Sequence, residues 1–86
     1  MNKNEIVKKL SDLLVGEAAF GDDGEPAIIT GIYRSPRSED RIFVDIRQDD
    51  GIRYQGFDLF NFLDAIDTDD DTINETKNLL DLFYEQ

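Results

Sequence analysis

Apolar and polar residues alternate through the middle of the chain, between residues 27 and 57. Residues 27–33 are rich in β-branched and aromatic side chains, and in residues 41–47 every second position is aliphatic. Residues 52–57 alternate again after Asp49-Asp50-Gly51, a sequence that tolerates the positive φ of a tight hairpin. A period of two is typical of strands, and short connections favour antiparallel neighbours. The pattern predicts a three-stranded antiparallel meander.

One face of this predicted sheet is apolar and the other is charged. Ile42, Val44 and Ile46 share a face, and Ile52 and Tyr54 are expected to continue it on the third strand. Helices before and after the sheet would cover this face.

A helical pattern precedes the strands. Asn2 can cap a helix, Glu5 stands where a capping box requires it, and Gly16 is suited to end the helix. The apolar stripe at helical spacing consists of Ile6, Val7, Leu10, Leu13 and Leu14. We expect this stripe to pack into the core, and binding of a partner helix is the alternative.

Two further helices are predicted after the strands. Asp58 is a good N-cap for the first, whose apolar stripe is Leu59, Phe62, Leu63 and Ile66. Phe60 lies off that stripe, so it either makes a second core contact or stays exposed as an anchor for a partner. An acidic linker, 67–71, leads to the last helix, which Asp71 or Thr72 would cap and which reaches about residue 85. Its stripe is Ile73, Thr76, Leu79, Leu80 and Phe83.

These elements predict one α+β domain over residues 1–86: an N-terminal helix, the three-stranded meander and two C-terminal helices. Residues 17–20 fit either a short strand or a covering loop, with Phe20 at the edge of the core. The alternative fold is a small SH3-like barrel with flanking helices, in which residues 17–20 supply an extra strand.

Composition removes several classes of chemistry. The chain has no cysteine and no histidine, which excludes disulfides, cysteine nucleophiles and histidine bases and removes the usual ligands of zinc and copper. No apolar run is long enough for a membrane span, and the N-terminus is too polar for a secretory signal. We therefore expect a cytoplasmic protein that is not an enzyme and has no cofactor.

Charge is unevenly distributed. The formal net charge is −11, and residues 58–86 carry nine acids against the single base Lys77, whereas all five arginines lie between residues 34 and 53. Nucleic-acid binding depends on neutralising phosphates, so we expect no direct binding of nucleic acid. A basic protein surface, such as that of a nucleic-acid-binding protein, is the expected partner.

The acidic linker partly matches a calcium-binding loop. Asp67, Asp69 and Asp71 have the alternate spacing that begins an EF-hand, but the sixth position is Thr72 rather than glycine and the twelfth is Asn78 rather than glutamate. We therefore interpret the linker as a solvated, helix-capping segment, with an acidic contact for a basic partner as the alternative.

The connection between the first two predicted strands carries Arg34, Arg37 and Arg41. Arginine suits phosphates and carboxylates, but Glu39 and Asp40 stand in the same loop, and no glycine-rich phosphate cradle accompanies it. We expect an exposed loop, with a protein contact or a phosphate site as alternatives.

Three functional hypotheses follow. The first is a small acidic inhibitor that blocks a basic, nucleic-acid-handling protein surface. DNA mimics and anti-CRISPR-like proteins of phages and mobile elements share this size and charge. The candidate carboxylates, all from the C-terminal part of the chain, are those of Asp58, Asp64, Asp67, Asp69, Asp70, Asp71, Glu75, Asp81 and Glu85.

The second hypothesis is a cellular adaptor, immunity-type protein or regulatory subunit that binds through the sheet and hairpin, with Phe43, Tyr33 and Phe60 as anchors. The third is a nucleotide or small-ligand sponge, which would use the arginines Arg34, Arg37, Arg41, Arg47 and Arg53.

Overall fold

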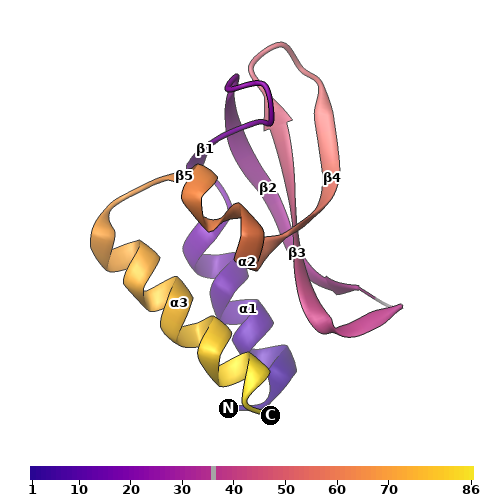
Figure 1. The fold of residues 1–86 in the computed structure, drawn as a ribbon, viewed down its shortest axis with the longest axis vertical. Helices are drawn as coiled ribbons and strands as arrows, with labels where there is room; N and C mark the ends of the chain where they lie inside the picture. The colour runs from indigo at the N-terminus through magenta and orange to yellow at the C-terminus, as the bar shows by residue number, and fades with distance from the viewer. Residues whose placement is uncertain (36) are drawn as a thin grey trace.

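The computed structural model describes residues 1–35 and 37–86, apart from the side chains of Ser38 and Glu39. In this part of the chain, three α-helices accompany one five-stranded antiparallel sheet (Figure 1), which confirms the α+β class. The elements in chain order are α1 (Lys3–Leu14), β1 (Ala18–Phe20), β2 (Pro26–Ser35), β3 (Ser38–Gln48), β4 (Arg53–Asp58), α2 (Leu59–Phe62), the 3-10 helix η1 (Leu63–Ala65), β5 (Ile66–Asp67) and α3 (Asp70–Tyr84).

The sheet is larger than the predicted three-stranded meander. Its strand order is β4-β3-β2-β1-β5, so β2, β3 and β4 form the expected meander and two short strands extend it. Ala18 lies opposite Ile28 of β2, and Ala19 lies opposite Ile66 of β5. Both added strands have three residues or fewer, which is too short for a period of two to appear in the sequence. The strand that the barrel alternative placed at residues 17–20 is present as β1.

The helix predicted after β4 is shorter than its apolar stripe suggested. Helix α2 makes one turn and gives way to η1, and Ile66 belongs to β5. Ile66 is buried in the strand, as it would have been on a helix. Burial of an apolar residue seven positions after Leu59 therefore does not distinguish a helix from a strand at this position.

Helix caps form largely as the sequence predicts. The Asn2 Oδ1 atom accepts a hydrogen bond from the Glu5 backbone N–H at 2.8 Å, and Asp58 Oδ1 accepts one from the Phe60 N–H at 3.0 Å. Helices α1 and α3 pack side by side, with the two chain termini adjacent (Figure 1). The fully buried hydrophobic side chains are Ile6, Leu10, Leu14, Ile29, Ile42, Val44, Ile46, Leu59, Leu80 and Phe83. None of the helices in the described ranges is long and apolar enough to cross a bilayer.

The third predicted strand departs from the predicted burial. Tyr54 lies opposite Ile46 and so shares its face, yet Tyr54 is 37% exposed and Ile52 is 50% exposed. The reason is that the β3–β4 hairpin extends beyond the helices (Figure 1). Nearer the helices, β4 has one more residue than β3 between paired positions, and Gly56 adopts a φ of +80° at this bulge.

The arginine-bearing connection is also shorter than predicted. Strand β2 continues through Ser35, which lies opposite Ser38 at the start of β3. Residues 34 and 40, predicted as loop, are therefore in strands. Strand pairing satisfies the backbone hydrogen bonds at this end of the hairpin, and the polar side chains there can stay exposed. Pro36, predicted in the same loop, lies outside the described residues.

We predict that Phe83→Ala destabilises the fold by about 3–5 kcal/mol, a large part of the stability of a domain this small. The Phe83 ring is fully buried, with the Lys3 ammonium 4.8 Å and the Arg34 guanidinium 5.7 Å from its centroid. Urea unfolding followed by circular dichroism measures the change. Leu82→Ala, at a neighbouring 43% exposed position, is the control and should change stability by less than about 1 kcal/mol. Equal losses for both variants would contradict the packing described.

Candidate functional site

Three acidic segments that are distant in sequence lie in the half of the molecule opposite the chain termini (Figure 1). They are the β1–β2 loop (21–25), the β3–β4 turn (49–51) and the connection from β5 into α3 (67–71), and we call them together the acidic end. The acidic end holds nine of the twenty acidic residues and no lysine or arginine. Sequence analysis identified only its C-terminal segment as a candidate site.

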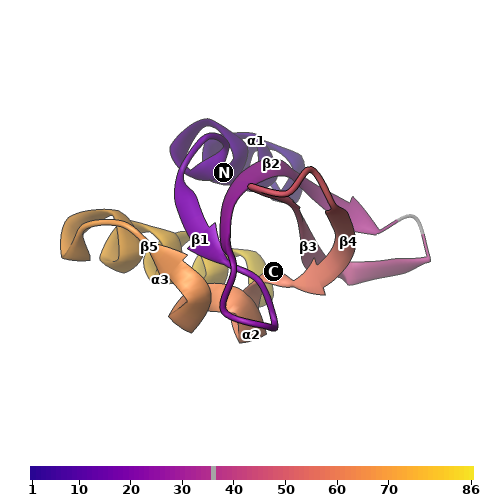
Figure 2. The ribbon, with the colours of Figure 1, turned by 90° about the horizontal axis from the view of Figure 1, so that it is seen from above.

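Backbone pairing in the sheet brings two of these segments together. The Asp49 N–H donates to the carbonyl oxygen of Pro26 at 3.1 Å, which joins the β3–β4 turn to the base of the β1–β2 loop. Asp67 lies opposite Ala18, at the end of β1 farther from the β1–β2 loop, so the third segment lies apart from the other two (Figures 1 and 2). The acidic end is thus a product of strand order, and no single stretch of sequence reveals it.

Gln48 fastens the β1–β2 loop onto the sheet. Its side chain is buried, and its Nε2 atom donates to Asp23 Oδ1 at 3.0 Å. Gly21 packs so closely on this amide that a Cβ at position 21 would overlap Gln48 Nε2. The Gln48 Oε1 atom has no hydrogen-bond partner among the described residues. Sequence analysis missed Gln48, although the alternation through Val44 and Ile46 continues to it and signals burial.

The β1–β2 loop is a hydrogen-bonded turn. The Gly21 N–H donates to the Glu25 carbonyl at 2.9 Å, and the Glu25 N–H donates to Asp23 Oδ1 at 3.0 Å. Gly24 has a φ of +78°, a conformation that glycine adopts without strain. Asp23 is therefore held by the turn, whereas the Asp22 carboxylate is exposed and has no hydrogen bond within the described structure.

The third segment is the start of α3. Asp69 is its N-cap and accepts a hydrogen bond from the Thr72 N–H at 2.7 Å, so the prediction of Asp71 or Thr72 as the cap is wrong. The Thr72 hydrogen bond lowers the pKa of Asp69 below its ordinary value. Asp70 and Asp71 are exposed in the first turn, where the helix dipole favours negative charge. Across the described ranges, no group of three or more potential ligands is arranged to hold a metal ion.

The remaining predicted carboxylates are spread over other elements. Asp64 is exposed in η1, and Glu75, Asp81 and Glu85 are exposed along α3 and at its C-terminal end. Because Asp81 and Glu85 lie beside the chain termini, they are separate from the acidic end.

Ion pairs occur at the opposite end of the molecule. Among the described side chains, Lys3 pairs with Asp40 at 2.8 Å and Arg41 pairs with Asp58 at 3.0 Å. The Lys3 hydrogen bond lowers the pKa of Asp40. Asp58, a predicted partner-binding residue, is thus already engaged by Arg41 and by the N-terminus of α2. The carboxylates of the acidic end have no such neutralising partner in the described structure.

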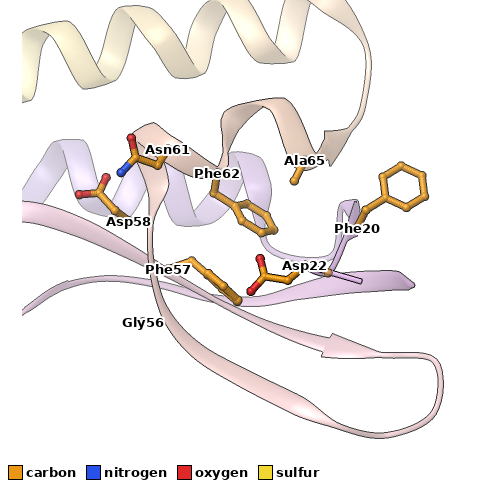
Figure 3. Close-up of a pocket in the computed structure, with 9 residues that line it drawn as sticks. Phe20, Asp22, Gly56, Phe57, Asp58, Asn61, Phe62 and Ala65 are labelled. Atoms are coloured by element: carbon orange, nitrogen blue, oxygen red, sulfur yellow. The ribbon is translucent and has the colours of Figure 1, made fainter. Parts of the chain in front are cut away.

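A pocket of about 390 Å³ lies between the β1–β2 loop, the end of β4 and α2 (Figure 3). The Phe57 and Phe62 rings are stacked, with centroids 5.4 Å apart, and the Asp22 side chain points toward them. Phe20, predicted at the core edge, is 43% exposed at the rim, because β1 ends before the helices can cover it. No lysine or arginine lines this pocket.

The curvature of the sheet creates the pocket. Figure 2 shows the strands curling from β4 round to β1, so that the β1–β2 loop approaches the end of β4. Gly21 and Gly56, on opposite sides of the pocket, come from these two segments. The sequence predicts neither the pocket nor its lining, because three separate segments form it.

The three arginines of the β2–β3 hairpin have different surroundings. Arg34 lies over the Phe83 ring, Arg41 is in the ion pair described above, and Arg37 is exposed where the two strands join. Arg34 and Arg41 are thereby positioned by contacts within the protein. The three arginines therefore do not share one loop, since Arg34 belongs to β2 and Arg41 to β3.

The two other arginines form a separate pair. Arg47 of β3 and Arg53 of β4 are direct cross-strand neighbours and line a second, polar pocket of about 280 Å³ together with Asp45. Arg41 is six residues from Arg47 along β3, or about 20 Å at the rise of an extended strand. The five arginines of the sponge hypothesis therefore do not gather in one site.

The candidate aromatic anchors differ in the exposure of their rings. Phe60 is 60% exposed on α2, the highest exposure among the large hydrophobic residues described. Phe43 is half-buried, and its ring centroid lies 6.1 Å from that of Tyr33. The Tyr33 hydroxyl donates to Asp45 Oδ1 at 2.9 Å, and burial together with this carboxylate raises the Tyr33 pKa.

Comparisons of the chain with protein-family models, with curated proteins and with solved structures find no match.

We predict that Gly21→Ala destabilises the protein by about 1–3 kcal/mol, because the new methyl group must displace the buried Gln48 amide and break its bond to Asp23. Chemical unfolding measures the change, and amide hydrogen exchange should show faster exchange at Gly21 and Gly24. Gly31→Ala is the matched control, since a Cβ there meets Asp45 only at ordinary contact distances. A stable Gly21→Ala protein with an unchanged loop would contradict the role given to Gln48.

Proposed function

We propose that the protein is a small binding protein whose acidic end occupies a basic protein surface, as an inhibitor of a nucleic-acid-handling protein would do. The observation that carries this proposal is that nine carboxylates lie in three segments of the half of the fold opposite the chain termini, and none of these segments contains a basic residue. The proposed contact includes Asp67, Asp69, Asp70 and Asp71 from the predicted set and adds the two hairpin loops.

Electrostatics support a basic protein as the partner. Lys3 and Arg41 pair within the fold at the opposite end, and the carboxylates of the acidic end form no ion pair among the described side chains. The exposed Arg47 and Arg53 flank the β3–β4 turn and offset part of its charge. A group of exposed negative charges attracts cationic surfaces and so accelerates their association at low salt. These carboxylates are suited to pair with the lysines and arginines that contact phosphates in a nucleic-acid-binding protein. A nucleic acid would be repelled by the same field.

We predict that neutralising four exposed carboxylates of the acidic end weakens partner binding by at least about tenfold at low salt, because several exposed ion pairs are lost together. The variant is Asp22→Asn, Asp49→Asn, Asp70→Asn and Asp71→Asn, none of which accepts a side-chain hydrogen bond within the described structure. The partner is captured with tagged protein at low salt and identified. Affinities of purified pairs are then measured along a salt series, in which wild-type binding should weaken steeply.

The matched control removes the same number of charges elsewhere. It combines Glu5→Gln, Asp12→Asn, Asp81→Asn and Glu85→Gln, which are exposed residues of α1 and of the C-terminal part of α3. Affinity of this control within about threefold of wild type would assign the effect to the acidic end rather than to net charge. Equal losses in both variants, or affinity that does not change with salt, would overturn the proposal.

A second candidate function is that of an adaptor or regulatory subunit anchored by Phe60. The specific observation is the 60% exposure of this ring. Under this alternative, Phe60→Ala should weaken partner binding by at least about tenfold while leaving the unfolding midpoint unchanged, because an exposed aromatic contributes to an interface without supporting the core. Salt-insensitive binding that is lost in Phe60→Ala and retained in the Asp/Asn variant would favour the adaptor.

A further inference from the structure

The pocket beside the β1–β2 loop combines stacked aromatic rings with an unneutralised carboxylate. The half-buried Phe57 ring supplies apolar surface and packs against the Phe62 ring, which is only 6% exposed, with the two centroids 5.4 Å apart. Asp22 stands at the opposite wall with its side chain directed toward the rings (Figure 3). The volume of about 390 Å³ is in the range of cavities that receive a ligand side chain or small molecule.

Only one of the two acidic residues that line the pocket is available to a ligand. Asp58 caps α2 with one carboxylate oxygen and accepts from Arg41 with the other. Asp22 is exposed and makes no such bond in the described part of the chain. The pocket thus has a single free anionic group facing an aromatic surface.

We propose that this pocket receives an arginine side chain from a basic segment of the partner protein. An arginine has an apolar stem that can cover the accessible part of Phe57, and a planar guanidinium that stacks on rings and pairs with a carboxylate. This inference rests on the proposed function, since the acidic end attracts the basic segment and the pocket selects one residue within it.

The charge of the lining excludes the opposite class of ligand. Phosphates and acidic peptides would meet Asp22 and Asp58 with no lysine or arginine in the pocket wall. A purely apolar side chain would fill the cavity but leave the Asp22 carboxylate in a less hydrated site without a partner. Charge complementarity therefore favours a cation that carries apolar surface.

The test is a titration of ¹⁵N-labelled protein with two short peptides that differ at one position. One carries a single arginine between glycine and serine residues, and the other carries citrulline, which keeps the shape but not the charge. The arginine peptide should shift the backbone amides of Gly21, Asp22, Gly56 and Asn61 in a saturable manner. The citrulline peptide should bind at least about tenfold more weakly.

Two variants distinguish binding in the pocket from general electrostatic attraction to the acidic end. Asp22→Asn should weaken binding of the arginine peptide by about tenfold, whereas Asp70→Asn, an equal charge change at an exposed site of the acidic end outside the pocket, should change it by less than about twofold. Neither residue supports the core, so both variants should unfold like the wild type.

The outcomes distinguish this inference from the proposed function. Equal affinity for the arginine and citrulline peptides, or no shifts around the pocket, would overturn the inference. Shifts confined to residues 67–71, or equal losses in Asp22→Asn and Asp70→Asn, would also overturn it while leaving the acidic end as a binding surface. Self-association abolished by Arg37→Ala would make a second copy the occupant and would overturn the assignment to a partner protein.

Discussion

The register between β2 and β3 determines both the core and the candidate binding surface. Because Ala27 lies opposite Gln48, Ile29 pairs with Ile46 and the aliphatic residues of both strands face the helices. The same register places the β1–β2 loop against the β3–β4 turn. A slip of one residue would turn every core side chain toward water, so the buried face keeps the two acidic loops in contact.

Concentrating carboxylates in one half of a small domain opposes folding by mutual repulsion, and the local structure offsets part of this effect. Asp23, Asp50 and Asp69 each accept a backbone hydrogen bond that closes a turn or caps a helix. These carboxylates have a structural explanation. Asp22 has none within the described structure, which is why its charge is the more informative indication of a binding surface.

Regular elements were predictable from sequence, and short or composite features were not. The aliphatic alternation through Ile42 and Val44 and the caps at Asn2 and Asp58 formed as expected, because each depends on residues close in sequence. Strands β1 and β5 are too short to show a period, and they form through pairing within the sheet and burial of Ala19 and Ile66. The exposure of Tyr54 depends on where the helices end, and the pocket depends on three separate segments. Candidate site residues were therefore predictable as charged or aromatic positions, but not as neighbours.

The acidic end and the pocket act over different distances. At physiological ionic strength, charges are screened beyond about 8 Å, so exposed carboxylates attract a basic surface but discriminate poorly among its cations. Discrimination between lysine and arginine requires a contact that only one of the two side chains can make. The Phe57 ring, supported by the buried Phe62 and opposite Asp22, provides such a contact, because one ligand group must both cover apolar area and pair with a charge. A lysine-rich surface would thus meet the same attraction as an arginine-bearing segment but a poorer fit to the planar face of the rings.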